Sequence, residues 1–150
     1  MRGVLIGVVA AVAVLGVAGA VAVPEAKEWY DGRHEQTSSY ATGKDAKADR
    51  ESVPRWLPDD ASSVEYAMRT TGGERLLKAT LSGDGLPGSC EPLDGKKAAD
   101  PEISASWFPA GTADRARGRC GSYYIALEDH TLYAWQTDKD WVEENRRSAQ

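Results

Sequence analysis

The chain has 150 residues, with 18 basic and 23 acidic side chains and a formal net charge of −5. Arg2 is the only charged residue before Pro24, so removing it from the 18 basic residues leaves 17 against 23 acidic ones, a net charge of −6. This balance argues against nucleic-acid and anionic-lipid ligands, which need a basic face. The length leaves room for one small domain.

Residues 4–23 are all Val, Ala, Leu, Ile or Gly. As a helix rising about 1.5 Å per residue, the run spans roughly 30 Å, the thickness of a bilayer's hydrocarbon core. It predicts a single-pass transmembrane helix, a signal anchor, after a cytoplasmic stub of residues 1–3. Arg2 keeps the N-terminus cytoplasmic by the positive-inside rule, so the C-terminus is expected outside the cell membrane.

A cleaved signal peptide is the alternative interpretation of this run. Arg2 supplies a thin charged start, and residues 18–20 or 20–22 have the small side chains of a cleavage site. Against cleavage, the run is longer than the usual signal core and Pro24 follows either site. The expected location is the cell membrane, with secretion as the alternative, and both place the later residues outside the cytoplasm.

The remaining residues predict a mainly β fold. Residues 24–52 are polar with no apolar period, which is typical of a flexible spacer. An extracytoplasmic β domain is expected over 53–137, followed by a charged tail, 138–150, that is helical around Trp141. Within the domain, alternating apolar residues predict a small antiparallel sheet of about five strands, at 64–68, 77–81, 103–107, 122–127 and 131–137.

Turn residues between these runs predict how the strands connect. Residues 71–74 and 128–130 separate neighbouring strands as hairpin turns do, and residues 58–62 favour one short helical turn. Trp-Leu-Pro at 56–58 and Trp-Phe-Pro at 107–109 each precede a predicted hairpin. The repeated Trp-x-Pro motif indicates either an internal duplication or a coincidence in a Trp-rich domain.

Cys90 and Cys120 are the two cysteines, and both fall in the exported part. In an oxidising compartment an even pair predicts one disulfide. A metal or redox pair would need closer spacing and partner histidines, so no metal site and no cofactor is expected.

Five Trp and six Tyr beside one Phe favour an interaction surface, because their rings bury area while keeping a polar tip. Side chains alternate between the faces of a strand, so an inward Tyr123 leaves Tyr124 exposed together with Tyr133 or Trp135. These three residues are the predicted binding site, for a protein or glycan partner outside the cell. The competing interpretation is that the spacer, the turn at 58–62 or the tail packs over them.

Catalysis finds little support in the sequence. His34 lies in the expected spacer and His130 in a hairpin turn, beside Asp129, whose side chain points to the opposite face of a strand. We therefore expect a non-catalytic binding module tethered to the membrane. The alternative is a secreted or cell-envelope hydrolase that uses the acidic turns near His130.

In layout the chain resembles small uncharacterised membrane-anchored or secreted proteins of actinobacteria. The resemblance rests on the Ala/Val/Gly-rich N-terminal run, the Ala-, Asp- and Arg-rich composition and the C-terminal Trp- and Cys-containing β domain. It implies no activity and carries over no functional residues.

Overall fold

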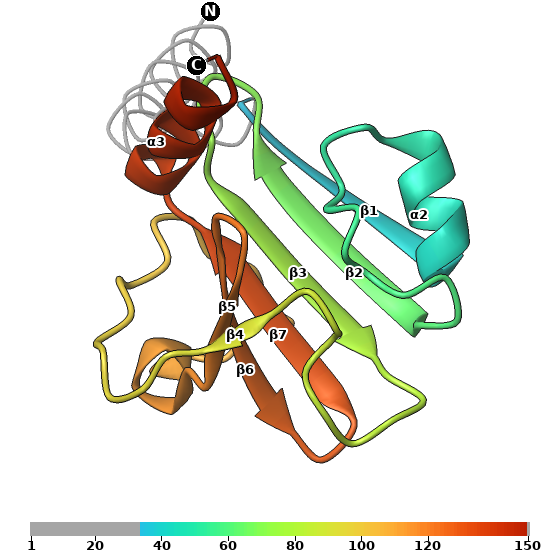
Figure 1. Cartoon of the computed structure of the whole chain (residues 1–150). Helices are drawn as coiled ribbons and strands as arrows, with labels where there is room; N and C mark the ends of the chain where they lie inside the picture. Colours follow the sequence, from blue (N-terminus) through green and yellow to red (C-terminus); the bar gives the residue numbers. More distant parts are fainter. Residues whose placement is uncertain (1–33, 150) are drawn as a thin grey trace, which may run out of the picture. The chain divides into compact units, whose positions relative to one another are not determined.

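A computed structural model of the chain describes residues 34–149. Its seven strands form one antiparallel sheet in the order β1-β2-β3-β7-β6-β5-β4 (Figure 1). The strands are β1 (Glu35–Thr42), β2 (Ser62–Arg69), β3 (Arg75–Thr80), β4 (Glu91–Pro92), β5 (Gly118–Cys120), β6 (Tyr123–Glu128) and β7 (Thr131–Gln136). The helices are α2 (Gly43–Asp49), the 3-10 turn η1 (Thr112–Arg115) and α3 (Asp138–Ser148). The prediction of a mainly β, antiparallel domain is confirmed.

The predicted transmembrane helix at residues 4–23 lies outside the described residues. Between residues 34 and 149, no helix has the length and apolar character required to span a membrane.

Both predicted hairpins are present. The β2–β3 loop closes with a 3.1 Å hydrogen bond from the Arg69 N–H to the Glu74 carbonyl. In the β6–β7 hairpin Glu128 pairs with Thr131, so the loop has two residues, and Asp129 takes the left-handed conformation with φ of 54°. Short polar residues such as Asp tolerate this conformation, which explains why the turn forms at this point.

The number of strands is seven rather than the expected five, and one expected strand is wrong. Residues 103–107 are irregular, and their alternation arises because Ile103 and Trp107 pack onto the sheet from a covering loop. Residues 58–61 form a turn rather than a helix, and Ser62 already belongs to β2. Strands β4 and β5 were missed because two or three residues are too short to show a period.

The expected spacer is also wrong where the structure describes it. Residues 35–49 form β1 and α2, so the ordered domain begins at Glu35 and not at residue 53. β1 escaped notice because it is an edge strand with polar residues toward both faces. Residues 24–33 lie outside the described part. Residues 138–148 of the expected charged tail form the helix α3, which includes Trp141, so the predicted helix around this residue is present.

One side of the sheet, called face one, is covered by α2 and the turns that follow it. Leu57, Val64, Tyr66 and Leu77 have no measurable exposure there, and Ala46 attaches α2 to the same cluster. Tyr123 and Ile125 of β6 extend this core across the sheet.

The opposite side, called face two, is covered by residues 93–117, the covering segment. Leu93, Ala98 and Ile103 of this segment are buried against Leu76 and Trp135 of the sheet. The Trp135 indole N–H donates to the carbonyl of Ala99 at 2.7 Å, which satisfies the one polar atom of a fully buried ring. The sheet is therefore covered on both sides along β3, β7 and β6, whereas Thr37, Ser39 and Ala41 of β1 are exposed on face two.

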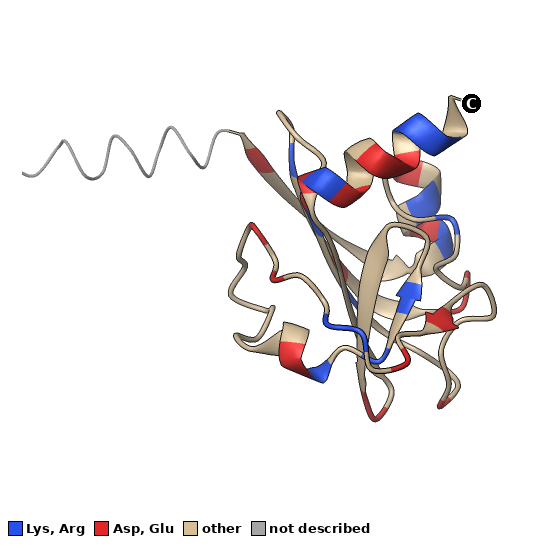
Figure 2. Ribbon diagram, turned by 60° about the vertical axis from the view of Figure 1, so that its left-hand side comes forward, with Lys and Arg blue, Asp and Glu red and all other residues tan. Residues whose placement is uncertain are grey.

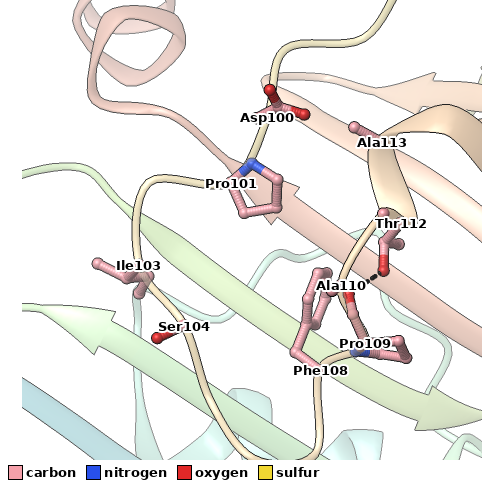
Figure 3. Close-up of a pocket in the computed structure, with 10 residues that line it drawn as sticks. Asp100, Pro101, Ile103, Ser104, Phe108, Pro109, Ala110, Thr112 and Ala113 are labelled. Atoms are coloured by element: carbon pink, nitrogen blue, oxygen red, sulfur yellow. Dashed lines mark hydrogen bonds between the residues drawn. The ribbon is translucent and has the colours of Figure 1, made fainter.

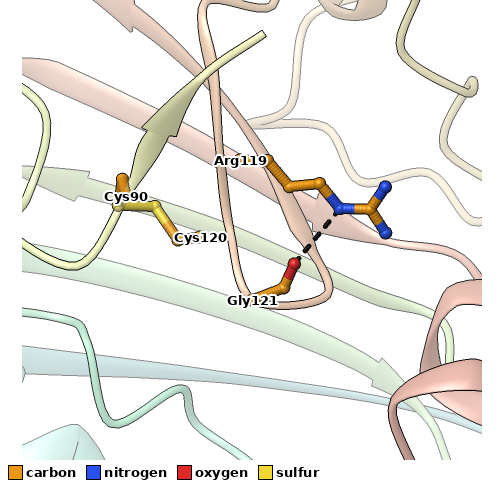
Figure 4. Close-up of a disulfide and its surroundings, with 4 residues drawn as sticks. All are labelled: Cys90, Arg119, Cys120 and Gly121. Carbon is orange, nitrogen blue, oxygen red and sulfur yellow. Dashed lines mark hydrogen bonds between the residues drawn. A yellow bond between two sulfur atoms is a disulfide. The ribbon is translucent and has the colours of Figure 1, made fainter. Parts of the chain in front are cut away.

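The disulfide Cys90–Cys120 is present, as predicted (Figure 4). It joins the start of β4 to the end of β5 across 30 residues of sequence, and Cys120 is fully buried. The loop that it closes contains the whole covering segment, so the bond restrains the layer over face two.

The two Trp-containing motifs are not related by a duplication of the fold. Both form the same turn, with the Leu57 N–H bonded to the Pro54 carbonyl at 3.2 Å and the Phe108 N–H to the Ala105 carbonyl at 3.0 Å. A duplication would relate the β2–β3 and β6–β7 hairpins by a twofold rotation about an axis between β3 and β7, perpendicular to the sheet. Such a rotation leaves each side chain on the same face of the sheet. Leu57 packs on face one and Phe108 on face two, so this rotation does not superpose the motifs.

Candidate functional site

The predicted binding residues Tyr124, Tyr133 and Trp135 lie on face two, as expected from their spacing. They are not exposed, because their accessible fractions are 8%, 8% and 0%. Phe108 of the covering segment packs edge-on against Tyr133 and Trp135, with ring centroids 5.6 and 6.0 Å apart. The expectation of an open aromatic face is wrong, and the segment that covers it is one that the sequence analysis took partly for a strand.

One row of side chains crosses face two and leads from this core to the surface. Trp135 pairs with Tyr124 across β7 and β6, and Tyr124 pairs with Arg119 of β5. The Trp135 and Tyr124 rings lie 5.8 Å apart, and the Arg119 guanidinium carbon lies 4.7 Å from the Tyr124 ring centroid. The aromatic core therefore ends in a cation stacked on its last ring.

Arg119 is held in place by four groups. Its Nη2 lies 2.8 Å from the Asp140 carboxylate, its Nε donates to the Gly121 carbonyl at 3.1 Å (Figure 4), and its Nη1 donates to the Tyr124 hydroxyl at 3.4 Å. The fourth contact is the Tyr124 ring itself. Asp140 is in turn bonded by the Thr137 hydroxyl that caps α3. A guanidinium fixed in this way is oriented before any ligand arrives.

Arg119 lies between two cavities, which together we call the Arg119 groove. A polar cavity of about 330 Å³ lies toward α3, and a smaller one of about 170 Å³ lies toward the covering segment. Glu91 and Arg119 line both. The other lining residues are Ser89, Gly121, Glu143, Glu144 and Arg147 in the first cavity, and Pro92, Leu93, Lys96, Lys97 and Tyr124 in the second.

The smaller cavity is the positively charged end of the groove. Lys96 and Lys97 are exposed, and among the described residues neither makes an ion pair. With Arg119 they give three positive charges against Glu91 and Asp140, a net charge of +1 around the cavity. α3, by contrast, carries both signs along its length (Figure 2). This end of the groove suits a singly charged anion.

A second, mostly apolar hollow of about 320 Å³ lies within the covering segment (Figure 3). Pro101, Ile103, Phe108 and Pro109 supply its apolar wall. Thr112 contributes a hydroxyl, but that hydroxyl donates to the Pro109 carbonyl at 2.6 Å. Asp100 is its one charged lining residue, so the hollow offers little that would orient a ligand.

The residues of the alternative hydrolase hypothesis lie elsewhere. The two ring nitrogens of His130 lie 3.2 Å from the Asp84 carboxylate and 3.2 Å from the Gly83 carbonyl, on an exposed hairpin. Glu128 forms an ion pair with Arg115, and His130 lines none of the three cavities described above. The carboxylate beside His130 is therefore that of Asp84 rather than of its neighbour Asp129.

No cluster of three or more potential metal ligands occurs among residues 34–149. Arg119 and the two lysines were missed as site residues by the sequence analysis. The alternation of Arg115, Arg117 and Arg119 could not have identified them, because Arg115 lies in η1 and β5 begins only at Gly118.

No family model matches the chain, and comparison with curated proteins and with solved structures finds no similar protein.

Proposed function

We propose that this protein is a membrane-tethered, extracytoplasmic binding module that holds a carboxylate-bearing ligand in the Arg119 groove without catalysis. The observation that carries the proposal is the Arg119 guanidinium, fixed by Asp140, Gly121 and the Tyr124 ring between two cavities. Membrane attachment rests on residues 4–23, whose length and apolar composition suit a transmembrane helix.

Charge favours a carboxylate over a phosphate group. A carboxylate carries one negative charge and matches the net charge of +1 around the smaller cavity, whereas a phosphate carries nearly two. Three of the five N–H groups of Arg119 already donate to Gly121, Tyr124 and Asp140, so one N–H on each terminal nitrogen is left for a carboxylate. The two lysines add charge at the rim. Pro92, Leu93 and Tyr124 line the same cavity and provide apolar contacts for the carbon skeleton next to the carboxylate.

The size of the cavity limits the ligand. A volume of about 170 Å³ is smaller than the usual range for a drug-sized molecule, so we expect the site to hold one terminal unit of a larger ligand. A peptide C-terminus and an acidic sugar both present such a unit, and both fit the extracellular protein or glycan partner expected from the sequence.

The proposal is tested by titrating the full chain in detergent with two probes, acetyl-Ala-Ala and its C-terminal amide, and with galacturonate and galactose as a second pair. Each acidic probe differs from its neutral counterpart mainly by the carboxylate. Calorimetry should detect binding of at least one acidic probe and weaker or no binding of its neutral counterpart.

Substitution of the lysines then assigns the binding to this groove. Replacing Lys96 and Lys97 together by Gln should weaken binding of the acidic probe about five- to tenfold, the effect of losing two partly exposed charges. Lys44 on α2 is exposed and lies outside the cavity lining, so Lys44→Gln is the matched control and should bind normally. Equal binding of acidic and neutral probes, or equal weakening by both substitutions, would contradict the proposal.

A further inference from the structure

The two edges of the sheet differ in how well they are protected. β4, at one edge, has two residues, and one of them is Pro92, which has no N–H to offer a passing strand. β1, at the other edge, has eight residues and contains no proline, lysine or arginine. Its pairing with β2 runs without a shift from Glu35 to Tyr40. β1 therefore lacks proline, lysine and a bulge, three of the features by which proteins block an edge strand.

The register shows which backbone groups of β1 are available. The Gly43 N–H donates to the Ala61 carbonyl at 2.8 Å, which makes Thr42 and Ser62 a non-hydrogen-bonded pair of the ladder. Bonded and non-bonded residues alternate along an antiparallel strand. The residues that direct both N–H and C=O groups toward the open edge are therefore Gln36, Ser38 and Tyr40. Thr42 adds only its N–H, because its carbonyl belongs to the first turn of α2.

The described surroundings leave this edge accessible. Of the outward-directed residues Gln36 is exposed and Ser38, Tyr40 and Thr42 are half-buried. The Arg50 guanidinium bonds the Gln36 side chain at 3.1 Å, which leaves the Gln36 backbone groups unoccupied by that contact. α2 packs on face one through Ala46. Thr42 is the N-cap of α2, so its carbonyl accepts the first hydrogen bond of that helix and is not available at the edge.

We propose that β1 pairs antiparallel with β1 of a second copy of this chain and joins the two sheets into one. Peptide ligands that add to a sheet edge are selected by pockets for alternate side chains. The three cavities described above are lined by residues between 89 and 147, and none involves β1. Pairing of two β1 strands needs no such pocket, because a twofold axis brings the same strand of each copy together and the backbone groups of one bond those of the other.

The faces of the sheet fix the register of this pairing. A twofold axis perpendicular to the sheet keeps face one beside face one, so paired residues must both be even-numbered or both odd-numbered. Centring the axis on Ser39 places Ser38 opposite Tyr40 and Gln36 opposite Thr42 of the second copy. Each Ser38–Tyr40 pair can then form two ladder bonds, and each Gln36–Thr42 pair one, from the Thr42 N–H. Glu35 is the one charged residue of β1, and it then lies opposite Gly43, so no like charges meet.

Cross-linking of Ser39→Cys tests the register directly. At a non-hydrogen-bonded pair the two Cα atoms lie about 4.5 Å apart, within the range of a disulfide. Because Cys90 and Cys120 are bonded to each other, the new thiol is free and unique. Mild oxidation of the full chain in detergent should convert most of it to a covalent dimer on a non-reducing gel. Ser148→Cys, on the exposed end of α3, is the collision control and should give little dimer.

Light scattering of the full chain with its natural serines supplies the second measurement. The protein mass should be that of two chains, and Ser39→Lys should reduce it to one, because two lysines would meet at the axis. Ser148→Lys should leave the dimer intact.

Four results would each overturn the proposal. They are a monomeric mass for the unsubstituted chain, equal cross-linking by both cysteine variants, a Ser39→Cys product whose mass is not that of two chains, and a thiol in the Ser39→Cys variant that does not react with maleimide.

Discussion

Gly73 is the residue at which the β2–β3 hairpin meets α3. Its N–H donates to the Asp138 carboxylate at 2.8 Å and its carbonyl accepts from the Gln136 amide at 2.6 Å, so its backbone is fixed on both sides. A Cβ placed there would lie 2.3 Å from Cβ and 2.4 Å from Cγ of Trp141. Because these atoms are at the base of the Trp141 side chain, the helix itself would have to move.

We therefore expect Gly73→Ala to lower the free energy of unfolding by about 1–3 kcal/mol, as overpacking usually does. A methyl group added at Gly83 would have no atom within 4 Å, and Gly83→Ala should change stability by less than about 0.5 kcal/mol. Urea unfolding followed by Trp fluorescence measures both. Indistinguishable midpoints for the two variants would mean that α3 does not pack on Gly73 as described.

Tyr66 and Tyr123, two tyrosines of face one, make the free energy of unfolding depend on pH in the alkaline range. Burial raises the pKa of Tyr123 well above its ordinary value, and burial is also the main cause of the raised pKa of Tyr66, partly opposed by its hydrogen bond to Ser52. The unfolded chain loses these protons near the ordinary pKa of about 10, before the folded chain does. The contribution to stability is complete below that pH and falls as the pH rises toward the folded pKa values.

Unfolding free energies should therefore decrease between about pH 9 and 11, and less steeply in Tyr123→Phe than in the unsubstituted chain. Tyr40→Phe serves as a control, because Tyr40 is only partly buried and donates to Asp49 on the surface. An equal slope for Tyr123→Phe and the unsubstituted chain would show that the Tyr123 phenol is not buried in the folded state.

Among the elements, the covering segment decides what the sheet exposes. It has little regular structure beyond the turn η1, and it is held by the disulfide that joins its two flanks and by the hydrogen bond from Trp135 to Ala99 near its start. Because the bond closes a loop of 30 residues, replacing both cysteines by Ala should lower the stability by roughly 3–4 kcal/mol on the chain-entropy model.

The same variant should bind the dye 1-anilinonaphthalene-8-sulfonate more strongly, because the aromatic residues of face two are uncovered when the segment loosens. Thermal unfolding and dye fluorescence report the two effects separately. A stable double variant without added dye binding would show that the covering segment is held by packing alone.

At the scale of the whole molecule, the period of apolar residues predicted a strand only where the strand has an apolar side or lies in the interior of the sheet. β2, β3, β6 and β7 were predicted because their alternation and turn residues are local signals. β1 was missed because polar residues occupy both of its sides, and 103–107 was misassigned because a loop that packs on a sheet can alternate like a strand. The burial of Trp135 depends on Ala99 and Phe108, which lie 36 and 27 positions away in the chain, and no local pattern contains that information.

The membrane tether is a prediction about the whole chain. Cell fractionation should recover the full-length protein in the membrane pellet after alkaline carbonate extraction, with its C-terminus accessible to added protease. A mature form beginning near Val21 or Val23 in the medium would instead support cleavage and secretion.

The most direct test of the binding proposal is a map of amide chemical shifts in the full chain in detergent micelles, recorded as acetyl-Ala-Ala is added. The account predicts saturable changes at Lys96, Lys97, Arg119 and Tyr124, and no such changes with the C-terminal amide. Changes centred on the apolar hollow at 100–113 or on His130, or no saturable change with acetyl-Ala-Ala or galacturonate, would contradict a carboxylate site in the Arg119 groove.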